Sequence, residues 1–307
     1  NTGKKGMDEL LGYNIYRDAE QINENILSST SYVDDNMFNG IYNYYVTAVY
    51  DEGESDASNT VEVIVDQPVI VYSDSMALVD LYNSCDGANW LFNDLWLEAP
   101  VSEWFGITTI DTRVTDIHLQ TMAVTGDLPE SMGDLTALKT LWLERNSITS
   151  IPESIGNLTE LEELWLGWNY ITSVPESIGN MSSLTQLHLG LMETPIGTLP
   201  ESFGNLVNLE WLALGNSGLN SLPESFGDLS SVVSCFLWGN NLTELPAGFG
   251  DMQSLNYLSL DDNQLTTLPE SFGDLDNLSR LFMENNQIIS LPESFGDLQT
   301  LDSVWAR

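Results

Sequence analysis

The chain has 307 residues, of which 46 are acidic and only 8 are Lys or Arg, giving a formal net charge of −38 at pH 7. A field of this sign repels nucleic acids and anionic lipid surfaces, so the composition argues against both as partners. No apolar run is long enough to cross a bilayer, which argues against membrane insertion, and two cysteines are too few for a small disulfide scaffold.

The first segment of the chain predicts β-structure. Leu11–Asp18, Tyr42–Tyr50 and Asn59–Val65 alternate between polar and apolar residues, as strands with one buried face do. Together they resemble the second half of a fibronectin type III domain, in the version found in large bacterial surface proteins. Because too few residues precede Leu10 for the first strands of that all-β sandwich, we expect a partial domain over residues 1–67 with an open apolar face. Either the parent chain is longer, or this half packs on something else.

A linker over residues 68–73 and a cap over residues 74–113 are expected next. Ser75 is suited to N-cap a helix that runs to about Asn83. The motifs Asn89-Trp90, Trp96 and Glu103–Ile107 follow it, and this order resembles the N-terminal cap of plant-type extracellular repeat proteins. That family often carries a cysteine pair near the last tryptophan, where this chain has Ser102 and Thr108. The resemblance therefore implies a cap held by tryptophan packing alone.

Residues 114–307 repeat one pattern, Leu-x-x-Leu-x-Leu followed by x-x-Asn-x-apolar-x-x-apolar-Pro. Its first apolar positions lie 23 to 25 residues apart, at Val114, Leu138, Leu161, Leu184, Leu209, Val232, Leu255, Leu278 and Leu301. These eight full repeats and a truncated ninth resemble the leucine-rich-repeat family. The resemblance implies an α/β-type solenoid, a horseshoe in which strands form a parallel concave sheet and short helical turns cover the convex side.

Each part of the repeat has a predicted role. The leucines of the alternating segment face the core, and the residues between them face outward. Asparagines at the turn after the strand are expected to form a hydrogen-bonded ladder, which Met122, Thr194 and Ser217 interrupt; they are Asn146, Asn169, Asn240, Asn263 and Asn286. The Pro-Glu-Ser-[Ile/Phe]-Gly-[Asn/Asp]-Leu segments predict helical turns ended by glycine.

The outward residues of the strands form columns that are rich in aromatic rings. Exposed aromatic clusters are typical of interaction sites, because large rings provide contact area at low entropic cost. Alternatively, the rings only cover the backbone of a broad sheet. The candidate ligand-binding residues are His118, Trp142, Arg145, Trp165, Trp168, His188, Trp211, Phe236, Trp238, Tyr257, Arg280 and Phe282. Glycines at 167, 190 and 215 are expected to leave a groove beside Trp165 and Trp211.

The sequence gives little sign of catalytic chemistry. His118 and His188 lie three repeats apart, about 14 Å, which is too far to share a metal or a proton relay. No metalloprotease motif, nucleophile elbow or phosphate loop occurs. We therefore expect no enzyme, cofactor or metal centre. Rows of glutamate and aspartate on the convex side predict either a solvated acidic surface or weak association with divalent cations. Cys85 and Cys235 are predicted to lie too far apart for a disulfide.

These features favour a non-catalytic module of an extracellular, secreted or cell-surface protein. The first hypothesis is adhesion or recognition, in which the aromatic concave face binds a protein partner. The second is glycan binding by the same rings. The third is that the segment is a targeting accessory of a larger secreted enzyme.

Overall fold

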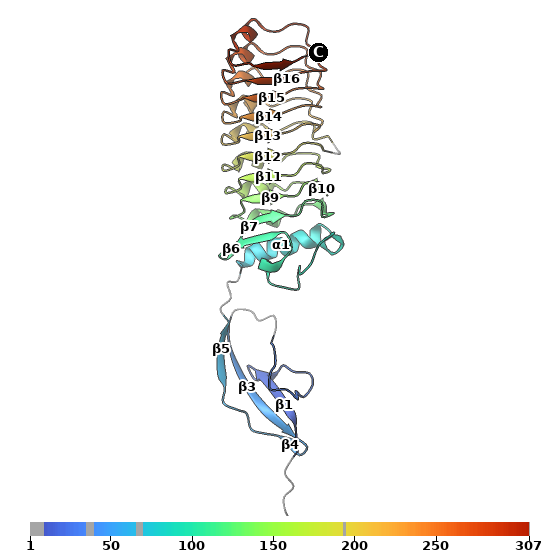
Figure 1. Ribbon diagram of the computed structural model, residues 1–307, viewed down its shortest axis with the longest axis vertical. Coiled ribbons are helices and arrows are strands. Elements are labelled where there is room, and N and C mark those ends of the chain that lie inside the picture. The colour runs from blue at the N-terminus through green and yellow to red at the C-terminus, as the bar shows by residue number, and fades with distance from the viewer. Residues whose placement is uncertain (1–8, 35–39, 66–69, 193–194, 307) are drawn as a thin grey trace, which may run out of the picture. The chain divides into compact units, whose positions relative to one another are not determined.

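The structure is a computed structural model that describes residues 9–34, 40–65, 70–192 and 195–306. The chain divides into two compact units, residues 1–69 and 70–307, and each is described by itself (Figure 1). Among the described residues, no helix is both long enough and apolar enough to cross a membrane.

The described strands of the first unit form one antiparallel sheet. Its central strand β3 (Gly40–Tyr50) pairs with β1 (Leu10–Arg17), β4 (Gly53–Glu54) and β5 (Val61–Val65), and β1 also pairs with β2 (Glu20–Gln21). These strands follow the alternating segments predicted from the sequence. Val61 and Val63 lie on the same face of the sheet as Tyr42 and Tyr44 and are exposed, as expected for a single sheet whose apolar face is not fully covered.

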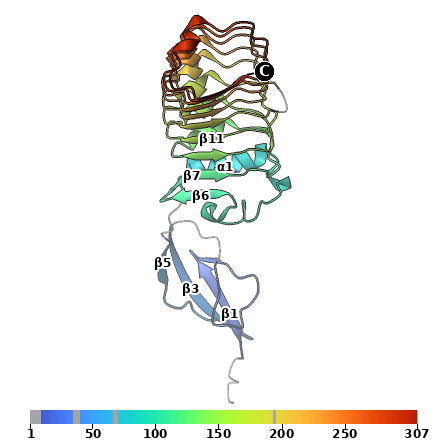
Figure 2. The same ribbon diagram turned by 45° about the horizontal axis from the view of Figure 1, so that its top comes forward.

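The second unit is a solenoid in which each coil contributes one short strand to a common sheet (Figures 1 and 2). In the part of the chain that the structure describes, this sheet has ten strands, and only the first pair is antiparallel. The strands are β6 (Ile107–Ile110), β7 (Arg113–His118), β9 (Thr140–Trp142), β11 (Glu163–Trp165), β12 (Gln186–His188), β13 (Trp211–Ala213), β14 (Ser234–Phe236), β15 (Tyr257–Ser259), β16 (Arg280–Phe282) and β17 (Ser303–Trp305). The short strands β8 (Thr125–Asp127) and β10 (Ser147–Ser150) pair in parallel beside it.

The register of the sheet agrees with the repeat pattern. Trp165 pairs with Trp142 on one side and with His188 on the other, so equivalent positions of successive repeats lie next to each other. The leucines between them, such as Leu141 and Leu164, are fully buried. The predicted inward and outward faces are therefore confirmed, and the outward face of the sheet, which the sequence predicts as concave, is called the sheet face below.

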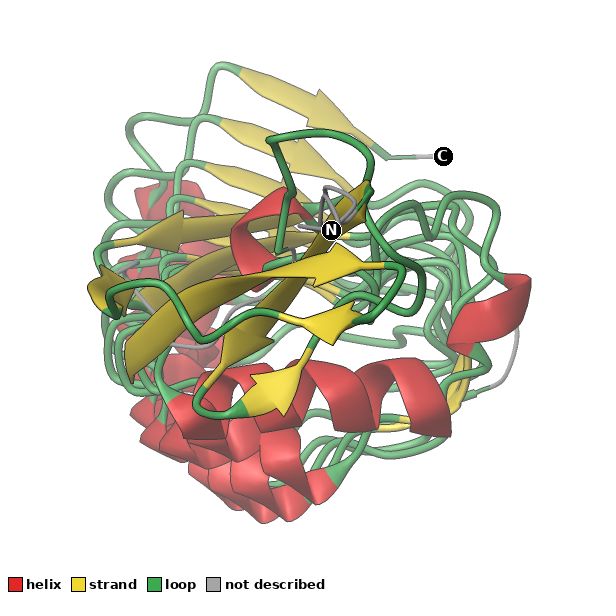
Figure 3. Cartoon of the chain, turned by 90° about the horizontal axis from the view of Figure 1, so that it is seen from below, coloured by secondary structure: helices red, strands yellow, loops and turns green. Residues whose placement is uncertain are grey.

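The opposite side of each coil carries a short helical turn, and these turns stack in a row apart from the strands (Figure 3). They are 3-10 helices at η3 (Glu130–Asp134), η4 (Glu153–Asn157), η5 (Glu176–Asn180), η6 (Glu201–Asn205), η7 (Glu224–Asp228), η8 (Phe249–Asp251), η9 (Glu270–Asp274) and η10 (Glu293–Asp297). The predicted turns are confirmed, but glycine does not end them. Gly133 lies within η3, and a Cβ atom there would lie 2.5 Å from the carbonyl oxygen of Ser154 in the next coil. Glycine is thus required by the close approach of neighbouring coils.

Acidic residues of the turns have a structural role. A carboxylate oxygen of Glu130 accepts a hydrogen bond from the backbone N–H of Ser154 at 3.2 Å, and Glu153 does the same for Ser177. Each glutamate thereby satisfies a donor at the start of the next 3-10 helix, where the backbone lacks a partner. Within the described ranges, no group of three or more His, Cys, Asp and Glu side chains is placed to hold a metal ion.

The predicted asparagine ladder is confirmed. Asn146 Oδ1 accepts backbone hydrogen bonds from Met122 and Val124, both at 3.0 Å, and its Nδ2 donates to the carbonyl oxygens of Leu119 and Leu143. Asn169, Asn240, Asn263 and Asn286 bridge their own coils to the preceding ones in the same way. At one interruption, the Ser217 hydroxyl donates to Leu189 O instead. At a second interruption, Met122, only the backbone N–H takes part, as a donor to Asn146 Oδ1. The third, Thr194, lies outside the described residues.

The cap differs from the sequence prediction at its first turn. Helix α1 (Tyr72–Ser84) begins after Val71, so Ser75 is not its N-cap and two residues assigned to the linker are helical. Val71 occupies the N-cap position, and its apolar side chain makes no capping hydrogen bond. The 3-10 helices η1 (Gly87–Asn89) and η2 (Val101–Glu103) follow in the cap.

Tryptophan packing holds the cap, but not alone. Trp96 lies 4.9 Å from Trp90 and 4.7 Å from Trp104, measured between ring centroids. Sequence reasoning missed Asp74, whose carboxylate is fully buried. It accepts hydrogen bonds from Arg113 Nε at 3.0 Å and from the backbone N–H of Val114 at 2.9 Å. This ion pair ties α1 to β7, the first parallel strand.

The two cysteines are separate buried thiols, as predicted. Burial raises the pKa of the Cys85 thiol to about 12 and also raises the pKa of Cys235. Both thiols therefore stay protonated near neutral pH and act as small apolar side chains.

Candidate functional site

A continuous row of aromatic rings in contact, some stacked and some tilted, crosses the sheet face from β7 to β17. Successive ring centroids lie between 4.1 and 6.1 Å apart. We call this row the aromatic ladder; it consists of His118, Trp142, Trp165, Trp211, Phe236, Tyr257, Phe282 and Trp305. All of these rings except Trp305, which is exposed, are half-buried, because each covers its neighbour and leaves its remaining surface to solvent.

The ladder stays continuous because small residues alternate with large ones on two strands. On β13, Ala213 holds the central position and the ring belongs to Trp211, two residues earlier. On β15, Ser259 and Tyr257 repeat this arrangement. The shifted Trp211 ring contacts Trp165 of β11, across β12, and Phe236 of the neighbouring strand β14. The shifted Tyr257 ring contacts Phe236 and Phe282 of the strands on either side.

His188 joins the ladder from the side and bonds to an acidic residue two coils away. Its ring stands edge-on to Trp165, Trp168 and Trp211, with centroid distances of 6.4, 5.1 and 5.8 Å. His188 Nδ1 lies 2.6 Å from Glu144 Oε1. The imidazole passes over Gly167, where a Cβ atom would lie 2.7 Å from His188 Cε1. The predicted groove at the glycines is therefore filled, at this point, by the histidine itself.

Burial and the Glu144 carboxylate act on the His188 ring in opposite directions. Burial disfavours the charged imidazolium, whereas the carboxylate favours it, and burial is the larger effect, so the pKa of His188 is lowered from its ordinary value. The pair is thus best described as a neutral imidazole whose Nδ1–H donates to a carboxylate. This assignment fixes the tautomer of the histidine, with the proton on Nδ1.

Replacing His188 with glutamine is expected to remove part of the acid sensitivity of folding. Because the folded-state pKa of His188 is lowered, the unfolded chain binds the proton more readily. The contribution of His188 to stability is therefore constant above the ordinary histidine pKa and falls as the pH drops below it. We expect urea midpoints to fall less in His188→Gln than in wild type between about pH 7.5 and about pH 5.5. Identical pH profiles for the two proteins would contradict the assignment.

The remaining predicted residues lie beside the ladder. The Arg145 guanidinium carbon lies 4.5 Å from the centroid of the Trp168 ring, a cation–π contact. Trp238 is half-buried and packs over Gly215, and Arg280 is exposed on β16. The structure thus brings together most of the predicted residues, while Trp238 and Arg280 lie outside the ring contacts of the ladder.

Two polar atoms of the ladder lack hydrogen-bond partners. Trp165 Nε1 and His118 Nε2 are buried, and the described residues offer neither of them a partner. By contrast, Trp142 Nε1 donates to Glu163 Oε2 at 3.0 Å. Unpaired buried polar atoms are uncommon in native proteins, so the first part of the ladder retains hydrogen-bonding capacity that its own residues do not use.

Family models match both units of the chain. The model described as "Leucine-rich repeat region" matches residues 117–189 and 187–260, and the model described as "Leucine rich repeat" matches residues 233–288. In the first unit, the model described as "Rhamnogalacturonan I lyases beta-sheet domain" matches residues 4–64. This match supports a β-sheet domain there and does not confirm the fibronectin type III or bacterial resemblance. A search of curated proteins gives no match.

Solved structures resemble the solenoid. The PEPR1–AtPEP1 crystal structure has 28% identity and a TM-score of 0.64, covering 76% of this chain and 38% of that one. The leucine-rich-repeat ectodomain of the receptor kinase GASSHO1/SCHENGEN3 from Arabidopsis thaliana has 27% identity and a TM-score of 0.64. The match covers 76% of this chain and 30% of that one. A leucine-rich-repeat protein from Bacteroides eggerthii shares the fold, with 17% identity and a TM-score of 0.58. The match covers 76% of this chain and 58% of that one.

This chain therefore spans well under half the length of the first two structures. The repeat spacing, the asparagine ladder, the parallel sheet and the matches over residues 117–288 agree with one another. Over this region, the chain belongs to the leucine-rich-repeat family.

Proposed function

We propose that the sheet face binds an extended segment of a protein partner along the aromatic ladder, without catalysis. The observation that carries this proposal is the continuous row of ring contacts from β7 to β17, in which every ring but the exposed Trp305 is half-buried. A row of this kind is typical of interfaces, because tryptophan and tyrosine are enriched among the few residues that contribute most to binding at protein contacts. A flexible chain laid along it would contact several coils in turn.

The comparisons support a binding role. The Arabidopsis thaliana ectodomain, 27% identical, was solved in complex with CASPARIAN STRIP INTEGRITY FACTOR 2, and the PEPR1 structure contains AtPEP1. Because both resemble the solenoid here, they favour a peptide or protein ligand. That one of them is an ectodomain also favours an extracellular location for this chain. We infer a secreted or cell-surface recognition or adhesion module.

A second candidate function is glycan binding in an accessory module of a polysaccharide-acting enzyme. The specific observation in its favour is the match of residues 4–64 to a β-sheet domain named for rhamnogalacturonan I lyases. Tryptophan rings also stack on sugar rings, so the same ladder suits a glycan. As part of this alternative we also propose that the first unit is a fibronectin-type spacer and that the chain comes from a bacterial surface protein.

The test is to screen the full chain in parallel against a random peptide display library and a glycan array that includes pectic oligosaccharides. The proposal predicts enriched peptides that share a sequence pattern and that lose binding when Trp142 is replaced with alanine. A matched control is Phe92→Ala, which removes an exposed ring from the cap instead of the ladder. Selective glycan binding without peptide enrichment would overturn the proposal in favour of the alternative.

A further inference from the structure

The first half of the sheet face places acidic side chains on both sides of two neighbouring tryptophans. The rings of Trp142 and Trp165, called the tryptophan pair below, lie 5.1 Å apart between centroids and are inclined by 24°. Glu163 lies two residues before Trp165 on β11, and Glu144 lies two residues after Trp142, just beyond the end of β9. Because alternate residues of a strand share a face, both carboxyl groups lie on the sheet face, one on each side of the tryptophan pair.

Neutral N–H groups hold the Glu163 carboxylate in place. Its Oε2 accepts a hydrogen bond from Trp142 Nε1 at 3.0 Å, and its Oε1 accepts one from Gln186 Nε2 at 3.3 Å. Both oxygens act as acceptors, as those of an ionised carboxylate do. The two donors are uncharged, so they orient the carboxylate without balancing its negative charge.

Glu144 is held on the other side of the tryptophan pair in a similar way. Its Oε1 lies 2.6 Å from His188 Nδ1, and its side chain is only 15% exposed. The imidazole is neutral, because burial lowers the pKa of His188, so this hydrogen bond brings no positive charge to the carboxylate. Across the described segments, neither Glu144 nor Glu163 forms an ion pair with a lysine or an arginine.

The basic side chains nearby contact other residues. Arg145 lies over the ring of Trp168, and Lys139 Nζ lies 3.4 Å from Glu162 Oε1. Removing a carboxylate from water without an opposite charge costs free energy, and the cost is largest where the group is mostly buried. A positively charged group from outside the chain would reduce this cost, so this part of the sheet face suits a cation.

The charge of the remaining sheet face has the same sign on balance. The outward positions of other coils carry Asp116, Asp261 and Glu284, against Arg280. The whole chain has a net charge of −38, and a field of this sign attracts cationic partners and repels anionic ones. Long-range attraction and the local arrangement of the carboxylates therefore favour the same class of partner.

We propose that the partner segment carries a lysine or an arginine whose side chain packs against the tryptophan pair and whose charged head lies beside Glu144 or Glu163. This inference rests on the proposed function and names the chemistry of a residue that the ladder recognises. Long basic side chains suit such a place, because their aliphatic stems cover apolar surface while their charged heads meet carboxylates. Arg145, which covers the Trp168 ring at 4.5 Å, makes a comparable contact with an indole within the chain itself.

The experiment uses peptides selected from the random library on the full wild-type chain. We expect them to share a lysine or an arginine at one position, and glutamine at that position to weaken binding about tenfold or more. The double variant Glu144→Gln/Glu163→Gln should weaken binding of the unchanged peptide to a similar degree, because glutamine keeps the size of the side chain and removes its charge. Isothermal titration calorimetry at a fixed salt concentration measures both changes.

The matched control is Glu224→Gln/Glu244→Gln. Both glutamates are exposed and lie beside the helical turns opposite the sheet, so this variant loses the same net charge without changing the ladder. We expect the affinity for the selected peptide to change less than about twofold, since salt screens distant charges. A peptide that has lost its basic residue should bind wild type and Glu144→Gln/Glu163→Gln with nearly equal affinity, because the interaction between the two groups is already absent.

Peptides that lose binding in Trp142→Ala bind through the ladder. If these peptides share no basic residue, or keep their affinity for Glu144→Gln/Glu163→Gln, the inference is wrong although the proposed function stands. Equal losses of affinity in Glu144→Gln/Glu163→Gln and in the control would trace the attraction to net charge instead of the tryptophan pair, and would also overturn the inference. A lack of any enriched peptide would refute the proposed function itself, and the inference with it.

Discussion

Replacing Trp165 and Trp211 together with alanine is expected to weaken binding of a selected peptide at least about 100-fold. The two rings are neighbours in the middle of the ladder, 6.1 Å apart, and both also contact His188. Their removal breaks the row and leaves the edge-on packing of the histidine incomplete. Isothermal titration calorimetry with the peptide measures the change.

The matched control removes an aromatic pair of the cap. Phe92 and Phe105 are exposed and lie 5.6 Å apart, so Phe92→Ala/Phe105→Ala deletes a comparable pair of rings away from the ladder. We expect the control to bind the peptide as wild type does. Circular dichroism should show that both double variants keep the fold, since the core leucines are untouched. Equal loss of affinity in both would place binding outside the sheet face.

Replacing Asp74 with alanine is expected to lower the free energy of unfolding by about 3 kcal/mol. The carboxylate is fully buried and accepts hydrogen bonds from Arg113 and from the backbone of Val114. Alanine would leave both donors without their partner at the junction of α1 and β7. Urea unfolding followed by circular dichroism measures the effect.

A surface ion pair provides the comparison. Lys139 Nζ lies 3.4 Å from Glu162 Oε1, and both side chains are about half exposed. Because solvent screens such pairs, Glu162→Ala should cost less than about 1 kcal/mol. If Asp74→Ala and Glu162→Ala shift the urea midpoint equally, the buried ion pair does not stabilise the cap as argued.

The sequence predicted the solenoid well because its period determines the register. Once the repeat was aligned, alternation alone placed Trp142, Trp165 and His188 side by side, and the strand pairing agrees. The asparagine ladder followed from the hydrogen-bonding capacity of the amide at a turn. Such features depend on spacing along the chain, which a sequence displays directly.

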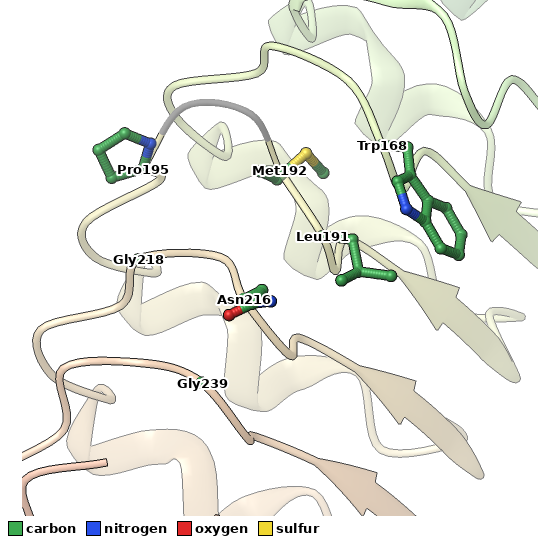
Figure 4. Close-up of a pocket in the computed structure, with 7 residues that line it drawn as sticks. All are labelled: Trp168, Leu191, Met192, Pro195, Asn216, Gly218 and Gly239. Carbon is green, nitrogen blue, oxygen red and sulfur yellow. The ribbon is translucent and has the colours of Figure 1, made fainter. Parts of the chain in front are cut away.

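Contacts between coils could not be predicted in the same way. The hydrogen bond between His188 and Glu144 joins residues that are 44 positions apart and passes over the coil between them. No periodic feature of the sequence indicates this contact. The start of α1 at Tyr72 was missed because no side chain caps it. The open space beside Trp168, Asn216 and Gly239 (Figure 4) was not predicted either, because the left-handed conformation of these positions appears only in the structure.

The account is tested most directly by fluorine NMR of the chain labelled with fluorotryptophan. The sequence has nine tryptophans; Trp90, Trp96 and Trp104 lie in the cap, and the other six lie on or beside the sheet face. Adding a selected peptide should shift the resonances of Trp142, Trp165, Trp168 and Trp211 and leave the three cap resonances unchanged. Shifts confined to the cap tryptophans, or a peptide that binds without shifting any ladder tryptophan, would contradict binding along the aromatic ladder.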